Sequence, residues 1–374
     1  MHSEQRLWVE KYRPLCIEDA QQIHRETYKM LGKLAQSDDF PHILFYGPSG
    51  AGKRTLTKCL LQELYKTNSV HKIKSEHKEF KASATSSTIV ECVVFSSNFH
   101  IEVTPSDADN QDRVIVQKLI KEVAGSQQLD TKAQKSFKVV VIHELDNLTR
   151  EAQAALRRTM ETYMPYCRII ANCESLSKVI QPLRSRCLQV RVPAPSGQEI
   201  TRVLDQISRT EGFDLPSQLA FSISNYSRRN LRRAIMMLQT AKLKNEKLSD
   251  KTYIPAPEYE TYTRDIAKMV VQEQSPKQLR QIRTKLYELL TKGITSDMIF
   301  QILAREFLKK SQSNDKNSAA LPEIIKPEVL KFAVMFEHRC KEGSKAIFHL
   351  EAFLARVMAI FKGYQIRAMG QKQY

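Results

Sequence analysis

Cysteine and tryptophan are scarce in the 374-residue sequence, which has seven cysteines and one tryptophan. The cysteines form no CxxC pair and their number is odd, which argues against a disulfide framework and a structural zinc site. No run approaches about 18 consecutive apolar residues, so the sequence excludes a membrane-spanning helix. Residues 1–6 lack the apolar core of a secretory signal. Together these absences favour a reducing compartment with free thiols.

Acidic residues are fewer than basic residues: the sequence has 41 aspartates and glutamates and 58 lysines and arginines, which gives a net charge of +17. Such an excess favours a polyanionic partner such as nucleic acid, with a solvated basic surface as the alternative. Apolar residues make up 42% and charged residues 26%, values typical of a soluble globular chain and too apolar for wholesale disorder. A chain of this length is expected to form two or three domains.

The first half of the chain alternates strand-like and helix-like segments. Short apolar runs predict strands at 42–46, 90–95, 138–142, 168–171 and 187–192. Helical patterns lie between them at 56–66, 112–125 and 150–164. Continuous apolar strands separated by helices are typical of a parallel sheet that is covered on both faces. Residues 66–81 are basic and polar, and we interpret them as a surface excursion.

Proline-rich segments divide the chain. Residues 193–197 (PAPSG) end the alternating pattern, and the sequence beyond them is helical. A second interruption falls at 248–257, where Pro255 and Pro257 break the periodicity. We therefore predict three domains: an α/β domain at 1–193, a small helical domain at 194–253 and a larger all-helical domain at 254–374.

A glycine-rich loop follows the first predicted strand and precedes a helical run. The loop comprises Gly47, Pro48, Ser49, Gly50, Ala51, Gly52 and Lys53. It fits the first seven positions of the Walker A pattern, in which glycines let successive backbone N–H groups point at phosphate oxygens. The following helix adds positive potential, and Lys53 is placed to reach the outer phosphates. The loop predicts a site for ATP or ADP.

The site departs from the pattern at two positions that should hold the metal. Walker A requires Ser or Thr after the lysine to hold Mg²⁺, and the sequence has Arg54 there. Thr55 cannot simply substitute, because one residue along a helix rotates the side chain by about 100°. The strand that should end in Asp-Glu ends in His143-Glu144, and imidazole is a poor ligand for this hard cation. Glu144 remains where the base should be. The departures predict weak or atypical Mg²⁺ coordination and impaired hydrolysis; a dispensable hydroxyl and a tolerated histidine are the alternative.

Six further segments form boxes along the chain. They are residues 7–14 (LWVEKYRP), 40–48 (FPHILFYGP), 148–161 (LTREAQAALRRTME), 182–187 (PLRSRC), 230–234 (NLRRA) and 343–351 (GSKAIFHLE). In order and in spacing they resemble the boxes of the AAA+ clamp loaders, specifically the small subunits of replication factor C, and they cover nearly the whole chain. Arg54, the missing Walker B aspartate and residues 106–109 (SDAD) are similar to one paralogous small subunit, which implies nucleotide binding with little turnover.

The resemblance implies a fold class: an α/β AAA+ P-loop module with a five-stranded parallel sheet, a small helical lid carrying sensor 2, and an all-helical C-terminal collar for oligomerisation. It also implies a nuclear subunit of a heteropentamer whose partners are the large and the other small subunits. That assembly opens the PCNA sliding clamp and loads it onto primer–template DNA, which it grips through phosphates. No membrane partner is expected, and no metal beyond nucleotide-bound Mg²⁺.

The resemblance also implies roles for individual residues. Those expected beside the nucleotide, besides the loop, Arg54 and Thr55, are Trp8, Tyr12, Arg13, Pro14 and the sensor 2 residue Arg232. Arg186 is the expected arginine finger for a neighbouring subunit, and pairing with an acidic residue of its own domain is the alternative. Arg157 and Arg158 are candidates for coupling between subunits, with a solvated basic face as the alternative. Arg113 is a candidate DNA contact.

The position of sensor 1 is ambiguous. Counting back without gaps from residues 185–187 places Glu174 where the family has asparagine. A carboxylate there would repel the γ-phosphate unless it were protonated or turned away. Asn172 lies two residues earlier on the same strand and so is able to face the same side. Both assignments stay open.

Three functions are compatible with the sequence. The leading one is an ATP-binding, hydrolysis-poor clamp-loader subunit, in which case the ATPase activity belongs to the complex. The second is a self-sufficient DNA-stimulated AAA+ ATPase, such as a helicase loader, which ATP turnover by the isolated chain would favour. The third is a scaffold that never binds nucleotide, which failure to retain ATP or ADP would favour.

Overall fold

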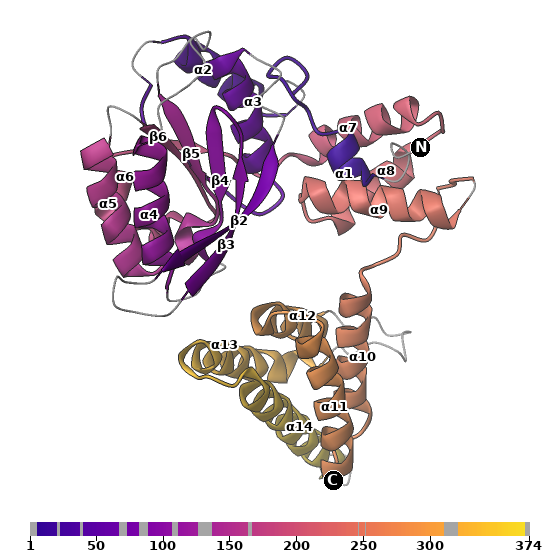
Figure 1. The fold of residues 1–374 in the computed structure, drawn as a ribbon. Coiled ribbons are helices and arrows are strands. Elements are labelled where there is room, and N and C mark those ends of the chain that lie inside the picture. The colour runs from indigo at the N-terminus through magenta and orange to yellow at the C-terminus, as the bar shows by residue number, and fades with distance from the viewer. Residues whose placement is uncertain are drawn as a thin grey trace. The chain divides into compact units, whose positions relative to one another are not determined.

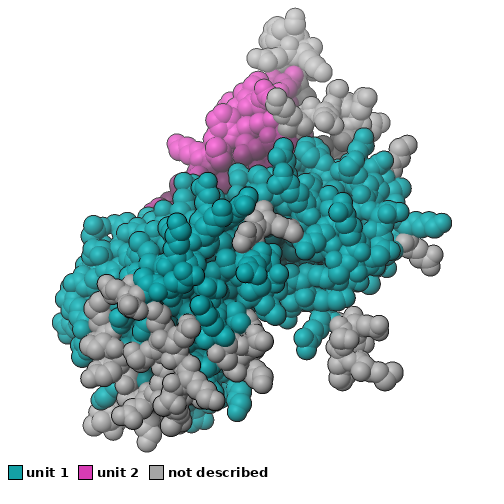
Figure 2. All heavy atoms as spheres, turned by 90° about the horizontal axis from the view of Figure 1, so that it is seen from above, with its two compact units in different colours: residues 1–254 teal, residues 255–374 magenta. Residues whose placement is uncertain are grey.

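The computed structural model describes residues 6–20, 23–37, 40–66, 73–81, 89–106, 111–125, 137–163, 167–245, 247–250, 252–309 and 321–370. The chain divides into two compact units, Met1–Ile254 and Pro255–Tyr374, which are shown in Figure 1 and coloured separately in Figure 2. Within the described ranges, no helix combines the length and the apolar character that crossing a membrane requires. All seven cysteines lie in these ranges, and all are free thiols.

The first unit contains a sheet, which in the described residues has seven strands in the order β2-β3-β4-β5-β6-β1-β7. The strands are β1 (Ile43–Tyr46), β2 (Lys74–Lys81), β3 (Ile89–Ser96), β4 (His100–Val103), β5 (Lys138–Ile142), β6 (Cys167–Cys173) and β7 (Leu188–Arg191). Strands β4, β5, β6, β1 and β7 pair in parallel, whereas β2 and β3 form an antiparallel hairpin that pairs with β4. The parallel core of the predicted fold is therefore present, with a hairpin added at one edge.

Two details of the predicted sheet are wrong. The strand expected at 90–95 is β3, which runs antiparallel, and the fifth parallel strand is instead β4, whose His100 and Glu102 hid it from a search for apolar runs. The segment 66–81 is not merely a surface excursion, because Lys74–Lys81 forms the edge strand β2. Its charged side chains suit an edge strand, since that position leaves them in water.

Helices cover both faces of the sheet, as the apolar strands predicted (Figure 1). Successive residues of β5 point to opposite sides: Val139 and Val141 pack toward α2 (Arg25–Gln36) and α3 (Lys53–Tyr65). Val140 and Ile142 belong to the other core. The helices that pack on this side are α4 (Asp112–Gly125) and α5 (Arg150–Tyr163). The short helices η3 (Leu145–Asn147), η4 (Leu176–Lys178) and α6 (Gln181–Arg184) also add residues to this core.

The remaining part of the first unit is helical and has its own apolar core. It is formed by α7 (Gly197–Thr210), α8 (Ser217–Tyr226) and α9 (Leu231–Lys244), and the short N-terminal helix α1 (Trp8–Lys11) contacts α9. A capping box of Ser196 and Glu199 starts α7, which fixes where the helical part begins. Ile200, Leu204 and Leu238 are fully buried in its core. The three-part division of the chain stays our proposal.

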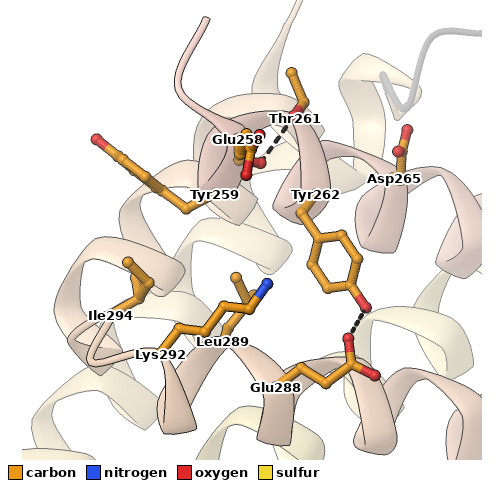
Figure 3. Close-up of a pocket in the computed structure, with 9 residues that line it drawn as sticks. All are labelled: Glu258, Tyr259, Thr261, Tyr262, Asp265, Glu288, Leu289, Lys292 and Ile294. Carbon is orange, nitrogen blue, oxygen red and sulfur yellow. Dashed lines mark hydrogen bonds between the residues drawn. The ribbon is translucent and has the colours of Figure 1, made fainter.

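The second unit is all-helical. Its helices are α10 (Glu258–Gln272), α11 (Pro276–Thr291), α12 (Ser296–Leu308), η5 (Glu323–Ile325), α13 (Lys326–Glu342) and α14 (Ala346–Gly370). Its core includes Phe300, Phe307 and Phe353, whose rings contact one another. A hollow of about 590 Å³ lies on this unit and is lined by residues of α10 and α11 and by Lys292 and Ile294 (Figure 3). None of the residues that the sequence predicted for a site lines it.

Candidate functional site

The glycine-rich loop connects β1 to α3, as predicted. Its three glycines have positive φ angles, of 155° at Gly47, 72° at Gly50 and 100° at Gly52. At Gly47 a Cβ atom would lie 1.9 Å from the carbonyl oxygen of Val192, so only glycine lets the loop pass this close to the chain beyond β7. The loop thus curves away from the strand and meets the first turn of α3, the geometry that suits phosphate binding.

Lys53 lies over the loop at the first residue of α3. Its Nζ donates hydrogen bonds to the carbonyl oxygens of Gly47, at 2.5 Å, and Pro48, at 3.0 Å. Burial lowers the pKa of Lys53, while the carboxylates of Glu174 and Asp146 act in the opposite direction and Arg232 adds to the lowering. The lysine ammonium therefore sits among the loop carbonyls, and the charges of Glu174 and Arg232 act on it in opposite directions.

Arg54 places a positive charge where Walker A has a hydroxyl. Its Nη2 lies 3.7 Å from Oε1 of Glu144, and both side chains are 48% exposed. Glu144, the second residue after β5, has a left-handed φ of 55°. The candidate base is thus paired with a guanidinium. Thr55 is half-buried on the next position of the helix.

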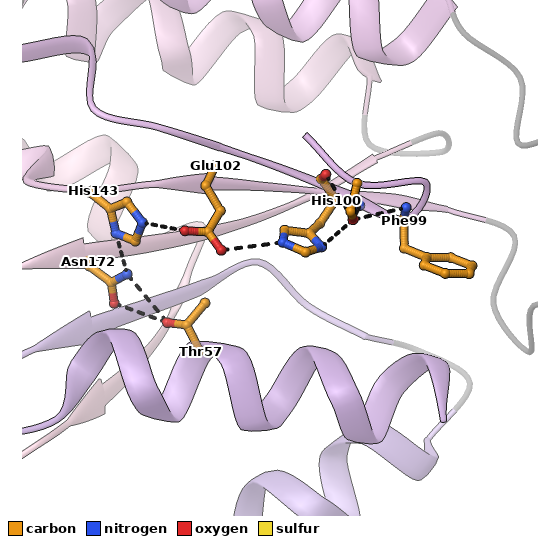
Figure 4. A network of polar contacts seen from close by, with 7 residues as sticks. Thr57, Phe99, His100, Glu102, His143 and Asn172 are labelled. Atoms are coloured by element: carbon orange, nitrogen blue, oxygen red, sulfur yellow. Dashed lines mark hydrogen bonds and ion pairs between the residues drawn. The ribbon is translucent and has the colours of Figure 1, made fainter. Parts of the chain in front are cut away.

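A buried chain of polar side chains runs from α3 to β4 beneath this site (Figure 4). Nε2 of His143 lies 3.1 Å from Oε2 of Glu102, whose Oε1 lies 3.3 Å from Nε2 of His100. On its other side, Nδ1 of His143 lies 3.1 Å from Nδ2 of Asn172. Asn172 in turn exchanges contacts of 3.4 Å with Thr57 on α3. The histidine at the Walker B position is therefore part of an internal network.

Donors and acceptors in this network determine the tautomer of His143. The Glu102 carboxylate only accepts, so Nε2 of His143 carries a proton and donates it to that carboxylate. Nδ1 then accepts a hydrogen bond from the amide nitrogen of Asn172. Both ring nitrogens are occupied, which leaves His143 no lone pair for a cation. With Arg54 in place of the hydroxyl, the residues at these two positions do not fit Mg²⁺. Among the residues described, no cluster of three or more His, Cys, Asp or Glu side chains is arranged to hold a metal ion.

The Glu102 carboxylate makes a testable contribution to stability. Burial raises its pKa, but hydrogen bonds from His100 and His143 and the charge of Lys58 outweigh burial, so the net pKa lies well below its ordinary value of 4.5. A carboxyl with a lowered folded-state pKa stabilises the fold above its unfolded pKa, and this stabilisation is lost as the pH falls.

We therefore expect the unfolding free energy to decrease below about pH 4.5, with Glu102 contributing up to about 1.4 kcal/mol per pH unit. Urea unfolding followed by circular dichroism at several pH values measures the slope. Glu102→Gln should flatten it, whereas Glu151→Gln, which changes an exposed carboxylate, should not. Equal slopes for the wild type and Glu102→Gln would contradict the assignment.

The two candidates for sensor 1 lie in different environments. Asn172 is buried and contacts His143 and Thr57, so its amide is committed to the network. Glu174 is exposed after β6 and influences Lys53 electrostatically. Glu174 carries a negative charge that acts on Lys53, whereas Asn172 is uncharged.

Arg186 pairs with an acidic residue of its own domain. Its Nη2 lies 2.6 Å from Oε1 of Glu161 on α5, and its Nη1 donates to the carbonyl oxygen of Pro182 at 2.8 Å. Glu161 also lies 3.8 Å from Nε of Arg157. The alternative that the sequence left open is thus realised in the single chain. The Arg186 side chain is nevertheless 38% exposed, so it remains accessible to another molecule.

The other predicted arginines lie on the surface. Arg158 is exposed on α5. Arg113, at the start of α4, lies 3.5 Å from Glu151, and both side chains are more than half exposed. Of the residues 106–109 (SDAD), those at 107–109 lie outside the described residues.

The N-terminal box lies between the loop helix and the lid helices. Trp8 stacks on Phe213 with 5.9 Å between ring centroids, and its backbone N–H donates to Gln239 of α9. Tyr12 donates its hydroxyl to Glu211, and the carbonyl of Pro14 faces the thiol of Cys59 on α3. Arg13 is half-buried beside them. That these residues lie against an adenine stays a prediction.

Two residues at the loop were missed by sequence reasoning. A ring nitrogen of His24 lies 3.1 Å from the carbonyl oxygen of Ala51. Asn230, which precedes α9, lies directly against Gly50. The left-handed φ of His24 is not visible in a sequence, whereas Asn before a helical run is a recognisable N-cap signal.

The loop, the five parallel strands among the described residues and the helical lid define an AAA+ P-loop module. A solved structure of RuvB from Thermotoga maritima, an alanine-to-serine mutant, has the same fold with a TM-score of 0.50 and 15% identity, covering 85% of this chain and 98% of that chain. Residues 23–196 match the family model "DNA polymerase III, delta subunit", and residues 202–243 match "RCF1/5-like, AAA+ ATPase lid domain".

Residues 259–365 match "Replication factor C subunit 3, C-terminal domain". Replication factor C subunit 3 of Homo sapiens is 46% identical over 358 residues, which is 96% of this chain and 97% of the relative. The same subunit of Arabidopsis thaliana is 45% identical over 365 residues, 97% of this chain and 100% of the relative. The chain belongs to the replication factor C family, within the subunit 3/5 group of AAA+ clamp-loader small subunits, which confirms the family that the boxes indicated.

Proposed function

We propose that this chain is the nucleotide-binding small subunit of a heteropentameric replication factor C complex in the nucleus. That complex opens the PCNA sliding clamp and loads it onto primer–template DNA. The observation that carries the proposal is the intact phosphate loop with Lys53 above it, in a chain whose relatives along its full length are replication factor C subunits. The excess of basic residues suits a DNA partner that is gripped through phosphates, with Arg113 as one contact.

The chain's own site is proposed to hold ATP or ADP with little hydrolysis. Two features support this: Glu144 is paired with Arg54, and His143 has no free nitrogen for Mg²⁺. We expect the isolated chain to retain nucleotide and to turn it over slowly.

The chain contributes to hydrolysis in the complex through Arg186, which is the proposed finger for the nucleotide of a neighbouring subunit. Arg157 shares Glu161 with Arg186, so a movement of this carboxylate affects both arginines. Together with the exposed Arg158, these residues would connect one nucleotide site to the next.

Lys53→Ala should weaken the binding of a fluorescent ADP analogue to the full-length chain by about 100-fold, because a charge-assisted contact to phosphate is lost. Lys33→Ala, which removes an exposed lysine from α2, is the matched control and should bind as the unchanged chain does. Fluorescence titration measures both.

The same preparation separates the alternatives. Rapid ATP turnover by the isolated chain would favour a self-sufficient DNA-stimulated ATPase, such as a helicase loader. Failure of the unchanged chain to bind ATP or ADP would favour a scaffold. Reconstitution with the other subunits, with ATPase measured with and without clamp and primed DNA, tests the role in the complex.

A further inference from the structure

The first turn of α9 rests on the phosphate loop. The backbone N–H of Leu231, the first residue of α9, donates to the carbonyl oxygen of Gly50 at 3.3 Å. The side chain of Asn230 lies so close to Gly50 that a Cβ atom there would be 1.9 Å from its Oδ1 and 2.3 Å from its Cγ. The same Oδ1 accepts from the N–H of Arg233 at 3.1 Å and caps α9. One asparagine therefore caps the start of α9 and touches the loop.

The turn that presents Asn230 is strained. Arg228 and Arg229 have left-handed φ angles of 53° and 63°, which residues other than glycine adopt rarely and at a cost. Hydrogen bonds from Arg229 hold the turn: Nε donates to the carbonyl oxygen of Pro195 at 3.0 Å and Nη2 to that of Ala194 at 2.7 Å. Ala194 and Pro195 lie in the segment that joins β7 to α7. The turn thus ties the loop to the connection between the sheet and the lid.

The need for glycine at residue 50 follows from this contact as well as from its φ angle. The general Walker A spacing requires glycine at positions 47 and 52 but leaves position 50 free. Here Gly50 has a φ of 72° and faces Asn230 with no room for a side chain. The loop therefore contacts the start of α9 in addition to its covalent connections to β1 and α3, and this contact restricts the motion of the loop.

We propose that Arg229, Asn230 and Leu231 form a clamp that holds the lid helix on the phosphate loop and so slows the release of bound nucleotide. The clamp rests on the proposed function, since the loop must bind nucleotide for its release to be controlled. Asn230 is a positioning residue that acts through Gly50, and Arg229 is a brace for the strained turn. Arg232 follows directly in α9, and its positive charge adds to the lowering of the Lys53 pKa.

The release rate of a fluorescent ADP analogue from the full-length chain, chased with excess unlabelled ADP in a stopped-flow instrument, tests the clamp. Asn230→Ala should release the nucleotide about tenfold faster, with a much smaller change in the association rate. Asn245→Ala is the matched control, because it removes the asparagine at the other end of α9, where its Nδ2 donates to the carbonyl oxygen of Ala241. Arg229→Gly, which tolerates the left-handed φ but loses both carbonyl bonds, should lie between the two.

A double-mutant cycle isolates the contact itself. Gly50→Ala should weaken nucleotide binding strongly in the unchanged chain and less strongly in Asn230→Gly, where the clash is removed and only the backbone strain remains. Equal losses in both backgrounds, or an Asn230→Ala release rate equal to that of the unchanged chain, would overturn the clamp while nucleotide binding stands. If the unchanged chain binds no ADP, both the clamp and the proposed function fail.

Discussion

Replacing Arg186 with alanine should lower the ATPase rate of the reconstituted complex and leave this chain's own nucleotide binding unchanged. An arginine that neutralises charge on a transferring phosphoryl group contributes about 10³-fold or more to the rate at the site that receives it. The total ATPase rate of the complex should therefore fall by the fraction that the nucleotide site receiving Arg186 contributes to it. Steady-state ATPase in the presence of clamp and primed DNA measures the first effect, and ADP binding to the isolated chain measures the second.

The salt bridge between Arg186 and Glu161 supplies the discriminating control. If Arg186 serves only as the internal partner of Glu161, then Glu161→Gln should impair the complex as much as Arg186→Ala does. If Arg186 is a finger, then Glu161→Gln releases it and preserves the rate. Arg184→Ala is the matched control for a nearby arginine, because Arg184 contacts Gln181 rather than an acidic residue. An unaltered ATPase rate in Arg186→Ala would remove the finger assignment.

The predictable parts of the fold are those whose stability comes from apolar burial. Strand β5 was evident because Val139, Val140 and Val141 are all fully buried, two on one face of the sheet and one on the other. A continuous apolar run of this kind is typical of a strand that is covered on both faces. Strand β4 was not evident, because His100 and Glu102 occupy it. Their burial is made possible by each other and by His143, which is 41 residues away along the chain from Glu102.

The same distinction applies to the site. The loop and its two departures, Arg54 and His143, are local patterns, and the structure places the loop, Arg54 and Glu144 together as the spacing implied. The pairing of Arg186 with Glu161 and the contact of Asn230 with Gly50 depend on tertiary packing, so no spacing rule predicts them. Sequence reasoning thus identified the phosphate-loop pattern, whose role stays a prediction, but it did not predict the tertiary contacts of Arg186 and Gly50.

Because His143 contacts Glu102, introducing a metal ligand at residue 143 also requires a change at Glu102. His143→Asp by itself puts a second carboxylate against the buried Glu102, so the fold loses a hydrogen bond and gains a repulsion. We expect this variant to be destabilised by about 3–5 kcal/mol, the range seen when a buried charge loses its partner. His143→Asn is the matched control, because asparagine has the shape of aspartate without its charge. This variant should be destabilised less than His143→Asp. Urea unfolding measures both.

Adding Glu102→Gln and Arg54→Thr to His143→Asp should recover most of that stability. The resulting triple variant has oxygen ligands at both residue 54 and residue 143. Because Mg²⁺ prefers carboxylate and hydroxyl oxygens, the triple variant should bind ADP more tightly with Mg²⁺ than with EDTA, by about tenfold or more, whereas the unchanged chain should show little difference. An ADP affinity of the triple variant that does not respond to Mg²⁺ would refute this account of Arg54 and His143. A Mg²⁺ response in the unchanged chain as large as in the variant would do the same, since it would mean that a site lacking both ligands coordinates the metal anyway.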